Sequence, residues 1–460
     1  MTKYKLALTL LLVVISSAKL VAQNQPDSAL IRSWIGADAP PGSEYLATDS
    51  IMYSMPGWKR DALGNLSLSK GSGSPRRVVA CGIDRPAFAV TEITDDGYLR
   101  LRELGAGRQH NLWVQFHEGQ RIRVLARKGE VQGVVIVKST HLQRGRVASS
   151  PATLDDLWVD VGATSRDDVQ RLGIEMLDPV VREIPESNYG EFVAGQLAGV
   201  RVGCAAVASA ARGQVTTGET IFLITTLRSF GYDGLEAALR SFGRVDQVTL
   251  VDQIADGSSN ASVLQRLVEK PAYLPETTGL SAVTILAPRL RFAGTLVESV
   301  YVPDALDLLS AVEKVAGVKP MQGGFRWPGL AEVSPRSKRQ VDAFSGTAEL
   351  LQLLADEPAV SGHERRVRAD IQNALPEWAQ KLTRTDNEGN LILEVGPERD
   401  PIMFIAHQDE VGFEITDIAA DGTVSLRTRG GMFQSLWEGQ PALLHFDQEG
   451  KTPLPGVFGG

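Results

Sequence analysis

An internal repeat constrains this 460-residue chain more than any other feature of its sequence. At an offset of 325 residues, "DALGNLSLSKG" (61–71) aligns with "DNEGNLILEVG" (386–396), and 84–102 aligns without a gap with 409–427. Of the 42 positions from 61 to 102, 14 are identical in the later copy. Solenoid repeats have periods of only about 20–50 residues. The sequence therefore predicts tandem duplication of a whole domain.

The repeat divides the chain into two copies joined by a linker. The first copy is expected to form an α/β domain from 27–90 and 189–315, with a β-rich domain, 91–188, inserted into it. Residues 317–345 are rich in glycine, proline and basic residues, which is typical of a linker. Residues 346–460 would then be the N-terminal part of a second domain of the same kind, cut off by the end of the chain.

The hydrophobic pattern supports this division. Alternating, glycine-punctuated stretches such as "FAVTEI" and "YLRLREL" predict short strands between 88 and about 160. Outside that region the pattern predicts a helix near 27–36, an apolar strand at 77–83, a helix at "VGCAAVASAAR" and a buried strand at "TIFLITTL". The expected fold class is α/β with an inserted β domain.

Composition and the N-terminus restrict the class of protein. The hydrophobic (43%) and charged (22%) fractions are those of a soluble globular protein, and a net charge of −8 argues against non-specific nucleic-acid binding. Residues 1–22 combine Lys3 and Lys5 with an apolar run and small residues, the pattern of a secretory signal peptide. We therefore expect a periplasmic or extracellular protein with no membrane attachment after signal cleavage.

The two cysteines leave two alternatives open. Cys81 and Cys204 cannot supply a four-cysteine zinc site. They are either two buried free thiols, since cysteine is often simply buried, or one disulfide formed in an oxidising compartment.

One histidine is placed for chemistry. His407 and Asp409 follow an apolar strand expected at "PIMFIA" (401–406), and ligands of open α/β sheets bind beyond the carboxyl ends of strands. Imidazole is a good zinc ligand, and a carboxylate two residues on can orient a ligand or a bound water. By spacing alone, this pair is either a metal site or an ordinary surface or core histidine. The other histidines show no ligand spacing: His110, His117, His141, His363 and His445.

Several segments together resemble a known enzyme family. "SGHE" (361–364), "DNEGNLILEVG" (386–396), "MFIAHQDEVGFEITDI" (403–418) and "LWVDVGATSRDDVQRLGIEMLDPVV" (157–181) resemble the glutamyl (deblocking) aminopeptidases, relatives of the tetrahedral aminopeptidases. The resemblance implies a zinc-peptidase-like mixed sheet flanked by helices. It also implies two divalent ions, zinc or cobalt, that share a bridging Asp and activate a water, while a Glu acts as general base. On the matching positions, His407 would be a metal ligand and Asp409 the supporting catalytic carboxylate.

The first copy departs from the family at nearly every functional position. Gly82 stands at the position of the ligand histidine, and only Asp84 of that pair remains. The two acids that include the bridging Asp align with Gly199 and Val200, and the two glutamates that supply base and ligand align with Arg228 and Ser229. Asp252 matches a ligand position, and the last histidine aligns loosely near Gly294. Two carboxylates cannot hold a two-metal site, so the first copy is expected to bind no metal and to be catalytically inactive.

The family alignment implies two further contacts in the first copy. A guanidinium at position 228 would lie beside Asp252 and form an internal ion pair that replaces metal charge with protein charge. Cys81 adjoins the lost histidine and Cys204 follows the lost bridging acid, so a Cys81–Cys204 disulfide becomes possible because these elements converge in the family's fold.

The functional expectation is a secreted metallo-aminopeptidase that cleaves N-terminal residues from peptides, provided that the second copy is completed beyond residue 460. Two divalent ions, zinc or cobalt, are expected in a completed second copy. The 460-residue chain itself is expected to be inactive, because its second copy holds one ligand histidine and no general base. The family also implies homo-oligomers assembled through the inserted β domain. The alternative is a non-catalytic scaffold that binds peptides or mediates assembly.

Overall fold

The computed structural model describes residues 27–105, 113–136, 151–183, 187–189, 191–254, 259–320, 327–330, 345–396, 402–431, 437–446, 451 and 453–459. It divides into two compact units: Met1–Lys338 with Gly439–Ala442 and Val457–Gly460, and Arg339–Glu438 with Leu443–Gly456. The expected signal peptide (1–22) and most of the expected linker (317–345) lie outside the described residues. Within the described part of the chain, no helix is long and apolar enough to cross a membrane.

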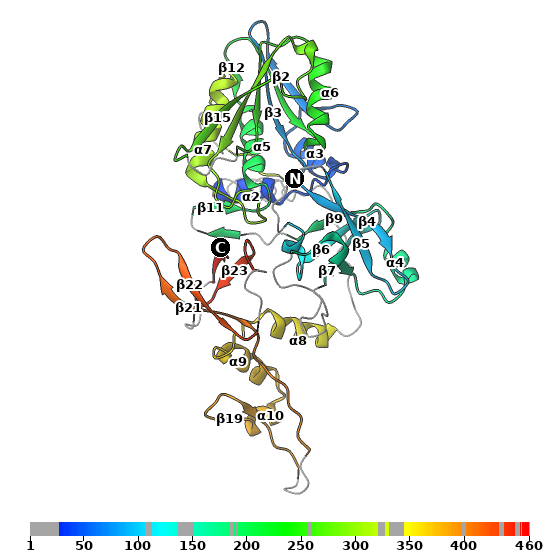
Figure 1. Cartoon of the computed structure of the whole chain (residues 1–460), viewed down its shortest axis with the longest axis vertical. Coiled ribbons are helices and arrows are strands. Elements are labelled where there is room, and N and C mark those ends of the chain that lie inside the picture. Colours follow the sequence, from blue (N-terminus) through cyan, green and yellow to red (C-terminus); the bar gives the residue numbers. More distant parts are fainter. Residues whose placement is uncertain are drawn as a thin grey trace, which may run out of the picture. The chain divides into compact units, whose positions relative to one another are not determined.

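A seven-stranded mixed sheet forms the centre of the first unit (Figure 1), in the order β1-β2-β13-β3-β14-β16-β15. β3 lies between β13 and β14 and runs parallel to both. Its residues Val78 to Cys81 are buried, as expected for a strand covered on both faces. The strands are β1 (Lys59–Arg60), β2 (Leu66–Gly71), β3 (Arg76–Gly82), β13 (Glu219–Thr225), β14 (Gln247–Val251), β15 (Val263–Glu269) and β16 (Ala282–Pro288).

Helices cover both faces of this sheet. On one face α5 (Ala198–Ala210) contacts β3 and packs against α2 (Asp27–Gly36) and α7 (Val302–Val315), whereas α6 (Asp233–Phe242) packs on the other face. Every residue of α5 is buried, and its alanine, glycine and valine side chains let it lie close to the strands. The other elements are α3 (Tyr45–Ser54), β10 (Ser187–Tyr189), β11 (Phe192–Ala194), β12 (Gln214–Val215), η3 (Arg228–Phe230), η4 (Glu276–Thr278), β17 (Ser299–Tyr301) and β18 (Val318–Lys319).

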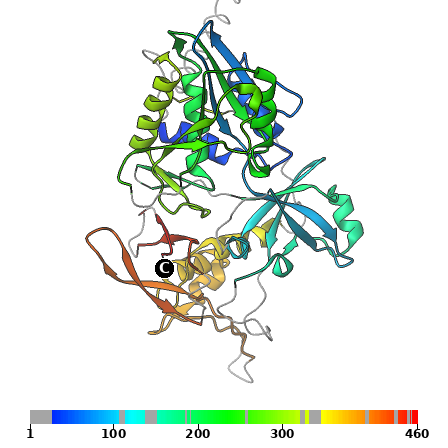
Figure 2. The ribbon, with the colours of Figure 1, turned by 45° about the horizontal axis from the view of Figure 1, so that its top comes forward.

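The predicted β insertion is a closed barrel in the order β4-β5-β8-β7-β6-β9, which lies beside the sheet (Figure 2). It begins at Ala87, a few residues earlier than expected, because only four residues separate the end of β3 from β4. Its own apolar core includes Val90, Leu99, Val124 and Val180. The elements are β4 (Ala87–Ile93), β5 (Leu99–Leu104), η1 (Gln115–His117), β6 (Arg121–Ala126), β7 (Gly129–Val135), η2 (Leu154–Asp156), β8 (Trp158–Asp160), α4 (Arg166–Leu172) and β9 (Pro179–Arg182).

The second unit contains three helices and three two-stranded sheets among its described residues. These elements are α8 (Ser345–Asp356), α9 (Arg365–Ala374), α10 (Glu377–Leu382), β19 (Arg384–Thr385), β20 (Leu391–Ile392), β21 (Gly412–Ile418), β22 (Val424–Arg429), β23 (Pro441–Leu444) and β24 (Leu454–Val457).

Backbone geometry recurs at the offset of the sequence repeat. The β21–β22 pairing has the register of β4–β5 shifted by 325, including an irregularity between Ile415 and Asp417 that matches one between Val90 and Glu92. Asp386 accepts the N–H groups of Glu388 and Asn390 as Asp61 accepts those of Leu63 and Asn65. Each Asp also accepts the amide of its Asn, at 2.8 Å and 2.7 Å. Equal sequence spacing thus gives equal local hydrogen bonding.

The strand expected at 401–406 is the exception, and that prediction is wrong. Residues 402–409 form no strand, and the side chains of Ile402, Met403, Phe404 and Ile405 are 78% to 93% exposed. At the same offset, 403–406 matches Val78–Cys81 of β3, which is buried. A strand needs neighbouring strands to hydrogen-bond with. The neighbours of β3 are β13 and β14, which come from much later in the sequence of the first copy. The described residues of the second unit supply no such neighbours.

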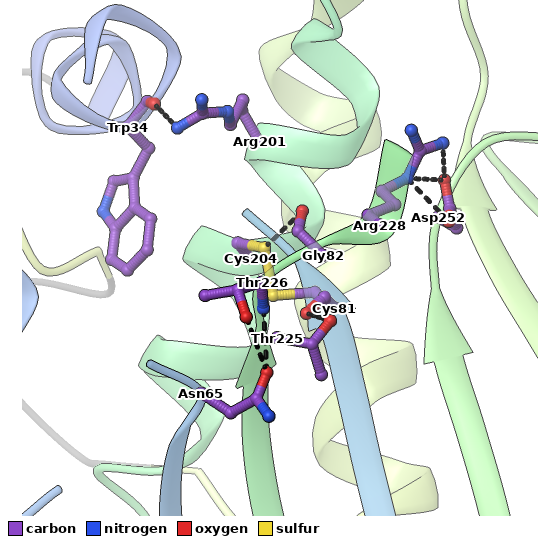
Figure 3. Close-up of a disulfide and its surroundings, with 10 residues drawn as sticks. All are labelled: Trp34, Asn65, Cys81, Gly82, Arg201, Cys204, Thr225, Thr226, Arg228 and Asp252. Carbon is purple, nitrogen blue, oxygen red and sulfur yellow. Dashed lines mark hydrogen bonds and ion pairs between the residues drawn. A yellow bond between two sulfur atoms is a disulfide. The ribbon is translucent and has the colours of Figure 1, made fainter. Parts of the chain in front are cut away.

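A disulfide joins the central strand to the main helix. Cys81 on β3 and Cys204 on α5 are bonded with an S–S distance of 2.09 Å, and both are fully buried (Figure 3). Of the two alternatives left open by the sequence, the structure has the bridge.

We expect the double variant Cys81→Ala, Cys204→Ala to unfold at lower urea concentration than the wild type. The bridge joins residues separated by 123 positions, and removing a native disulfide of this kind costs about 2–5 kcal/mol, chiefly by freeing the unfolded chain. Mass spectrometry after alkylation, with and without reductant, checks that the bridge is present. If the wild type contains the bridge and the double variant has the same urea midpoint, the disulfide does not stabilise the fold as expected.

Candidate functional site

Arg228 follows strand β13 and Asp252 follows strand β14, the two strands on either side of β3, and their side chains form an ion pair (Figure 3). Arg228 Nε donates to Asp252 Oδ1 at 3.1 Å and to Oδ2 at 3.0 Å, and Nη2 donates to Oδ1 at 2.5 Å. The two side chains are 15% and 2% exposed, so water screens the pair little. The ion pair expected from the sequence is therefore present.

Gly82 makes room for the Arg228 side chain. A Cβ atom at Gly82 would lie 2.5 Å from Cδ, 2.6 Å from Cβ and 2.8 Å from Cγ of Arg228, far inside van der Waals contact. The resemblance described above would place the family's ligand histidine at this position. The guanidinium side chain thus fills the space that a ligand side chain at residue 82 would need.

Asp84 orders the short η3 helix that carries Arg228. Its carboxylate is fully buried and accepts the backbone N–H of Arg228 at 2.6 Å and that of Ser229 at 2.8 Å. Negative side chains are favourable at a helix start, where backbone N–H groups have no helical partner. The Ser229 hydroxyl is buried and has no hydrogen-bond partner among the described residues. Asp84 therefore has a structural task that needs no metal.

Gly199 and Val200, where the resemblance would place the bridging acid, are also closely packed. The N–H of Gly199, at the start of α5, donates to Glu298 Oε1 at 2.9 Å, and Val200 is buried. A Cβ atom at Gly199 would lie 2.6 Å from Leu290 Cδ2. The Glu298 carboxylate also accepts Gly294 N–H at 3.1 Å and the Gln253 amide at 2.7 and 2.8 Å. An internal carboxylate thus occupies the N-terminus of α5.

Three residues of this cluster were not predicted from the sequence. Tyr232 donates its hydroxyl to Asp252 Oδ2 at 2.5 Å, while Gln253 and Glu298 bind each other beside it. Tyr232 directly follows the aligned segment 228–231, and Gln253 follows Asp252. For Tyr232 and Gln253, the sequence signal that could have pointed to the cluster is that each residue is adjacent to a position aligned with the family's site. Glu298 lies four residues beyond the loosely aligned Gly294, and nothing in the pattern pointed to it.

Burial and the ion pair control the electrostatics of the cluster. Burial acts to lower the pKa of Arg228, but its interactions with Asp252, Tyr232 and Asp84 together raise that pKa above its usual value. Burial, followed by the Asp252 charge, raises the pKa of the Tyr232 hydroxyl. Burial also raises the pKa of Glu298 against the effect of its three donors. Arg228 is therefore a permanent cation, and the Tyr232 hydroxyl keeps its proton.

The residues of the first copy do not fit a two-metal centre. The structure brings Asp84, Asp252, Arg228 and Gly82 together, but the guanidinium stands among the carboxylates where metal charge would have to be. Across the described residues, no group of three or more His, Cys, Asp and Glu side chains could hold a metal ion. No catalytic step through a metal can be derived for this centre.

The second unit holds the other candidate pair. His407 is 87% exposed, and its Nδ1 lies 2.9 Å from the backbone oxygen and 3.4 Å from Oδ1 of Asp409. Asp409 Oδ2 accepts the Ser361 hydroxyl at 2.6 Å, and this hydrogen bond is the main cause of a lowered pKa of Asp409. The structure thus places His407 beside Asp409 but brings no third ligand to them among the described residues.

We expect Arg228→Met to lower the free energy of unfolding of the first unit by about 3–5 kcal/mol, because it leaves the buried Asp252 carboxylate without its cation. Urea denaturation followed by fluorescence measures the loss. Arg240→Met is the matched control: its ion pair with Glu236 is exposed and contributes less than about 1 kcal/mol. Adding Asp252→Asn to Arg228→Met should recover part of the loss, whereas equal losses in the Arg228 and Arg240 variants would refute the role of the pair.

We expect Gly82→Ala to destabilise the protein by about 1–3 kcal/mol, because the new methyl group would overlap the Arg228 side chain. Gly36→Ala is the control, since a Cβ at Gly36 meets nothing within 4 Å. Thermal unfolding of both variants compares them. A Gly82 variant as stable as the Gly36 variant would show that Arg228 can move aside.

Comparisons with known proteins show the family of this chain. The model of the M42 glutamyl aminopeptidase family matches residues 64–261 and 389–460, together more than half of the chain. Lysyl aminopeptidase of Pyrococcus furiosus is 34% identical over 119 residues, which cover 26% of this chain and 33% of that protein. SgcX of Escherichia coli K12 is 29% identical over 189 residues, covering 39% of this chain and 49% of SgcX. The chain thus spans about half or less of these relatives.

Solved structures share the fold. The TET1 peptidase of Pyrococcus horikoshii superposes with a TM-score of 0.55 at 20% identity, covering 63% of this chain and 99% of that one. An aminopeptidase of Desulfurococcus kamchatkensis gives 0.55 at 19% identity, covering 64% and 95%. These likenesses confirm the expected α/β fold class, and the family match confirms the resemblance seen in the sequence. This protein belongs to the M42 glutamyl aminopeptidase family.

Proposed function

We propose that this protein is a secreted M42-family protein in which the first copy is a non-catalytic domain and the second unit is the opening part of an aminopeptidase domain. The two segments matched by the family begin at residues 64 and 389, the same 325-residue offset as the repeat. The recurring β-hairpin register and Asp turns support descent of both units from one domain. The composition of residues 1–22 supports secretion to the periplasm or the exterior.

The observation that carries the non-catalytic assignment is the packing of Arg228 against Gly82. Family activity depends on divalent ions, and a positive side chain fixed among Asp84 and Asp252 repels a second positive charge. The same side chain excludes a ligand at residue 82. The positive charge of Arg228 and the space that its side chain fills both favour a domain that stays folded without metal.

In the second unit, His407 is proposed as a metal ligand and Asp409 as its supporting carboxylate. Asp409 is held by Ser361 and lies beside the imidazole, as a carboxylate that orients a ligand would. The exposed apolar residues 402–405 precede this pair, and their equivalents in β3 are covered by β13, β14 and α5. A second copy completed beyond residue 460 would cover them and bring further ligands. Its proposed activity is hydrolysis of N-terminal residues of peptides with zinc or cobalt.

Assembly into homo-oligomers through the β barrel is part of the proposal. The TET1 peptidase of Pyrococcus horikoshii can assemble into a tetrahedron or a large octahedral shell. The barrel of this chain is closed and has its own core, so it can present a rigid surface to a partner.

We expect the 460-residue chain to hydrolyse no aminoacyl-nitroanilide in the presence of zinc or cobalt, and to bind well below one zinc per chain by elemental analysis. Addition of a chelator should leave its melting temperature unchanged, because Arg228 rather than a metal compensates Asp252. His407→Ala serves as the control and should change none of these results. Metal-dependent hydrolysis that disappears in His407→Ala would show that the 460 residues already contain a working site.

A further inference from the structure

The turn that leads into strand β9 of the barrel holds a leucine in a backbone conformation that leucine rarely adopts. The N–H of Asp178 donates to the Glu175 carbonyl at 3.3 Å and closes the turn, and the N–H of Glu175 donates to Asp178 Oδ2 at 2.8 Å. Leu177, the third residue of the turn, has a φ of 70°. Glycine or asparagine normally occupies a third position with positive φ, because most side chains are strained there. Leu177 is thus strained where a glycine would be relaxed.

The strained turn is fixed against the barrel. Val90 of β4 accepts the N–H of Leu177 at 2.8 Å and donates its own N–H to the Asp178 carbonyl at 3.0 Å. A Cβ atom at Gly173, just after α4, would lie 2.9 Å from Cδ of Lys128, so the turn between β6 and β7 packs closely beside it. α4 itself lies on the side of the barrel away from the seven-stranded sheet (Figure 1). This part of the barrel therefore presents a preformed surface.

Two large apolar side chains of the turn are exposed to solvent. Met176 is 51% exposed and Leu177 is 73% exposed. The strain at Leu177 is therefore not offset by burial of its side chain in the core of the barrel. A strained residue that gains nothing within the fold points to a function in binding. Methionine fits the same function, because its flexible side chain adapts to irregular partner surfaces.

Charged residues of both signs surround these apolar side chains. Glu175 and Asp178 flank them in the turn, and Arg127 and Lys128 form the neighbouring turn between β6 and β7. Burial raises the pKa of the Asp178 carboxyl, and the charge of the nearby Arg127 opposes this shift. None of these four residues forms an ion pair with another described residue. A surface that carries an apolar centre and unpaired charges of both signs can complement itself.

The barrel tip is defined here by six residues: Arg127, Lys128, Glu175, Met176, Leu177 and Asp178. We propose that two copies of this chain bind each other through the barrel tip about a two-fold axis. Met176 and Leu177 form the apolar centre of the contact, and the acidic side chains of each copy face the basic side chains of the other. A second copy fits better than an acidic or a basic partner, because the tip carries two charges of each sign. The inference rests on the proposed assembly through the β barrel and names the surface that makes it.

Leu177→Gly tests the contact directly, because this substitution removes the apolar side chain and relieves the backbone strain at the same time. The dissociation constant of self-association should rise about tenfold or more. The melting temperature, measured in solutions dilute enough for the wild type to be monomeric, should stay the same or rise. Analytical ultracentrifugation of the full chain over a series of concentrations measures the association. Phe292→Gly is the matched control, since it relieves a φ of 54° at a side chain that is 39% exposed, and it should leave the association unchanged.

Charge reversal tests how the two copies are oriented. Glu175→Lys and Lys128→Glu should each weaken self-association, because like charges then meet across the axis. A mixture of these two variants should associate more strongly than either variant alone, since opposite charges meet again in the mixed dimer.

The outcomes separate this inference from the proposed assembly. Self-association that is equally strong in the wild type, Leu177→Gly and the charge variants would overturn the barrel tip as the contact and leave assembly through another surface. A wild type that stays monomeric at every concentration would overturn both. Equal weakening by Leu177→Gly and Phe292→Gly would also overturn the barrel tip, because the effect would then not be specific to it.

Discussion

Pairing of β3 on both edges is the constraint on which the rest of the first unit depends. Its parallel ladders with β13 and β14 join segments from opposite ends of the copy, and the barrel is inserted between them. The disulfide to α5 fixes the helix against the same strand. Residues 402–405 show what the same kind of sequence does without such neighbours: its apolar side chains stay in water. A central strand is thus specified by its partners as much as by its own residues.

The end of β3 also shows how acidic side chains at strand ends can be held without a metal ion. Acidic side chains gathered at strand ends repel one another unless a cation lies among them. In this chain Arg228 supplies that cation from within, and Asp84, Glu298 and Tyr232 are held by hydrogen bonds that need no metal. The centre has therefore become part of the core. Its polar groups are satisfied within the protein, with the Ser229 hydroxyl and Arg201 as exceptions among the described residues.

Much of the fold could be predicted from sequence because the signals are local. The helix at 27–36, the apolar strand expected at 77–83 and found at Arg76–Gly82, and the alternating strands of the barrel follow from periodicity and glycine placement. The Arg228–Asp252 pair could be predicted from the family alignment, because Arg228 aligns with a glutamate of the family's site and Asp252 aligns with a metal ligand. Glu298 could not be found this way, because its role depends on a contact with Gly199, 99 positions away in the sequence. The strand at 401–406 failed for the same reason, since its partners and not its composition decide whether it forms.

The coupling between Gly82 and Arg228 makes the change in the first copy hard to reverse one residue at a time. A histidine at 82 overlaps the Arg228 side chain, so the ligand cannot return while the arginine is present. Loss of the arginine first leaves Asp252 buried without a cation, which is the costlier state of a broken ion pair. At Gly199, a returning acid would overlap Leu290 and lie close to the Glu298 carboxylate. Each of these single substitutions toward a metal centre is therefore expected to destabilise the domain. Only simultaneous substitutions at several strand ends would avoid this loss of stability. A domain with this packing can stay folded without a metal ion, because selection on stability alone keeps these residues as they are.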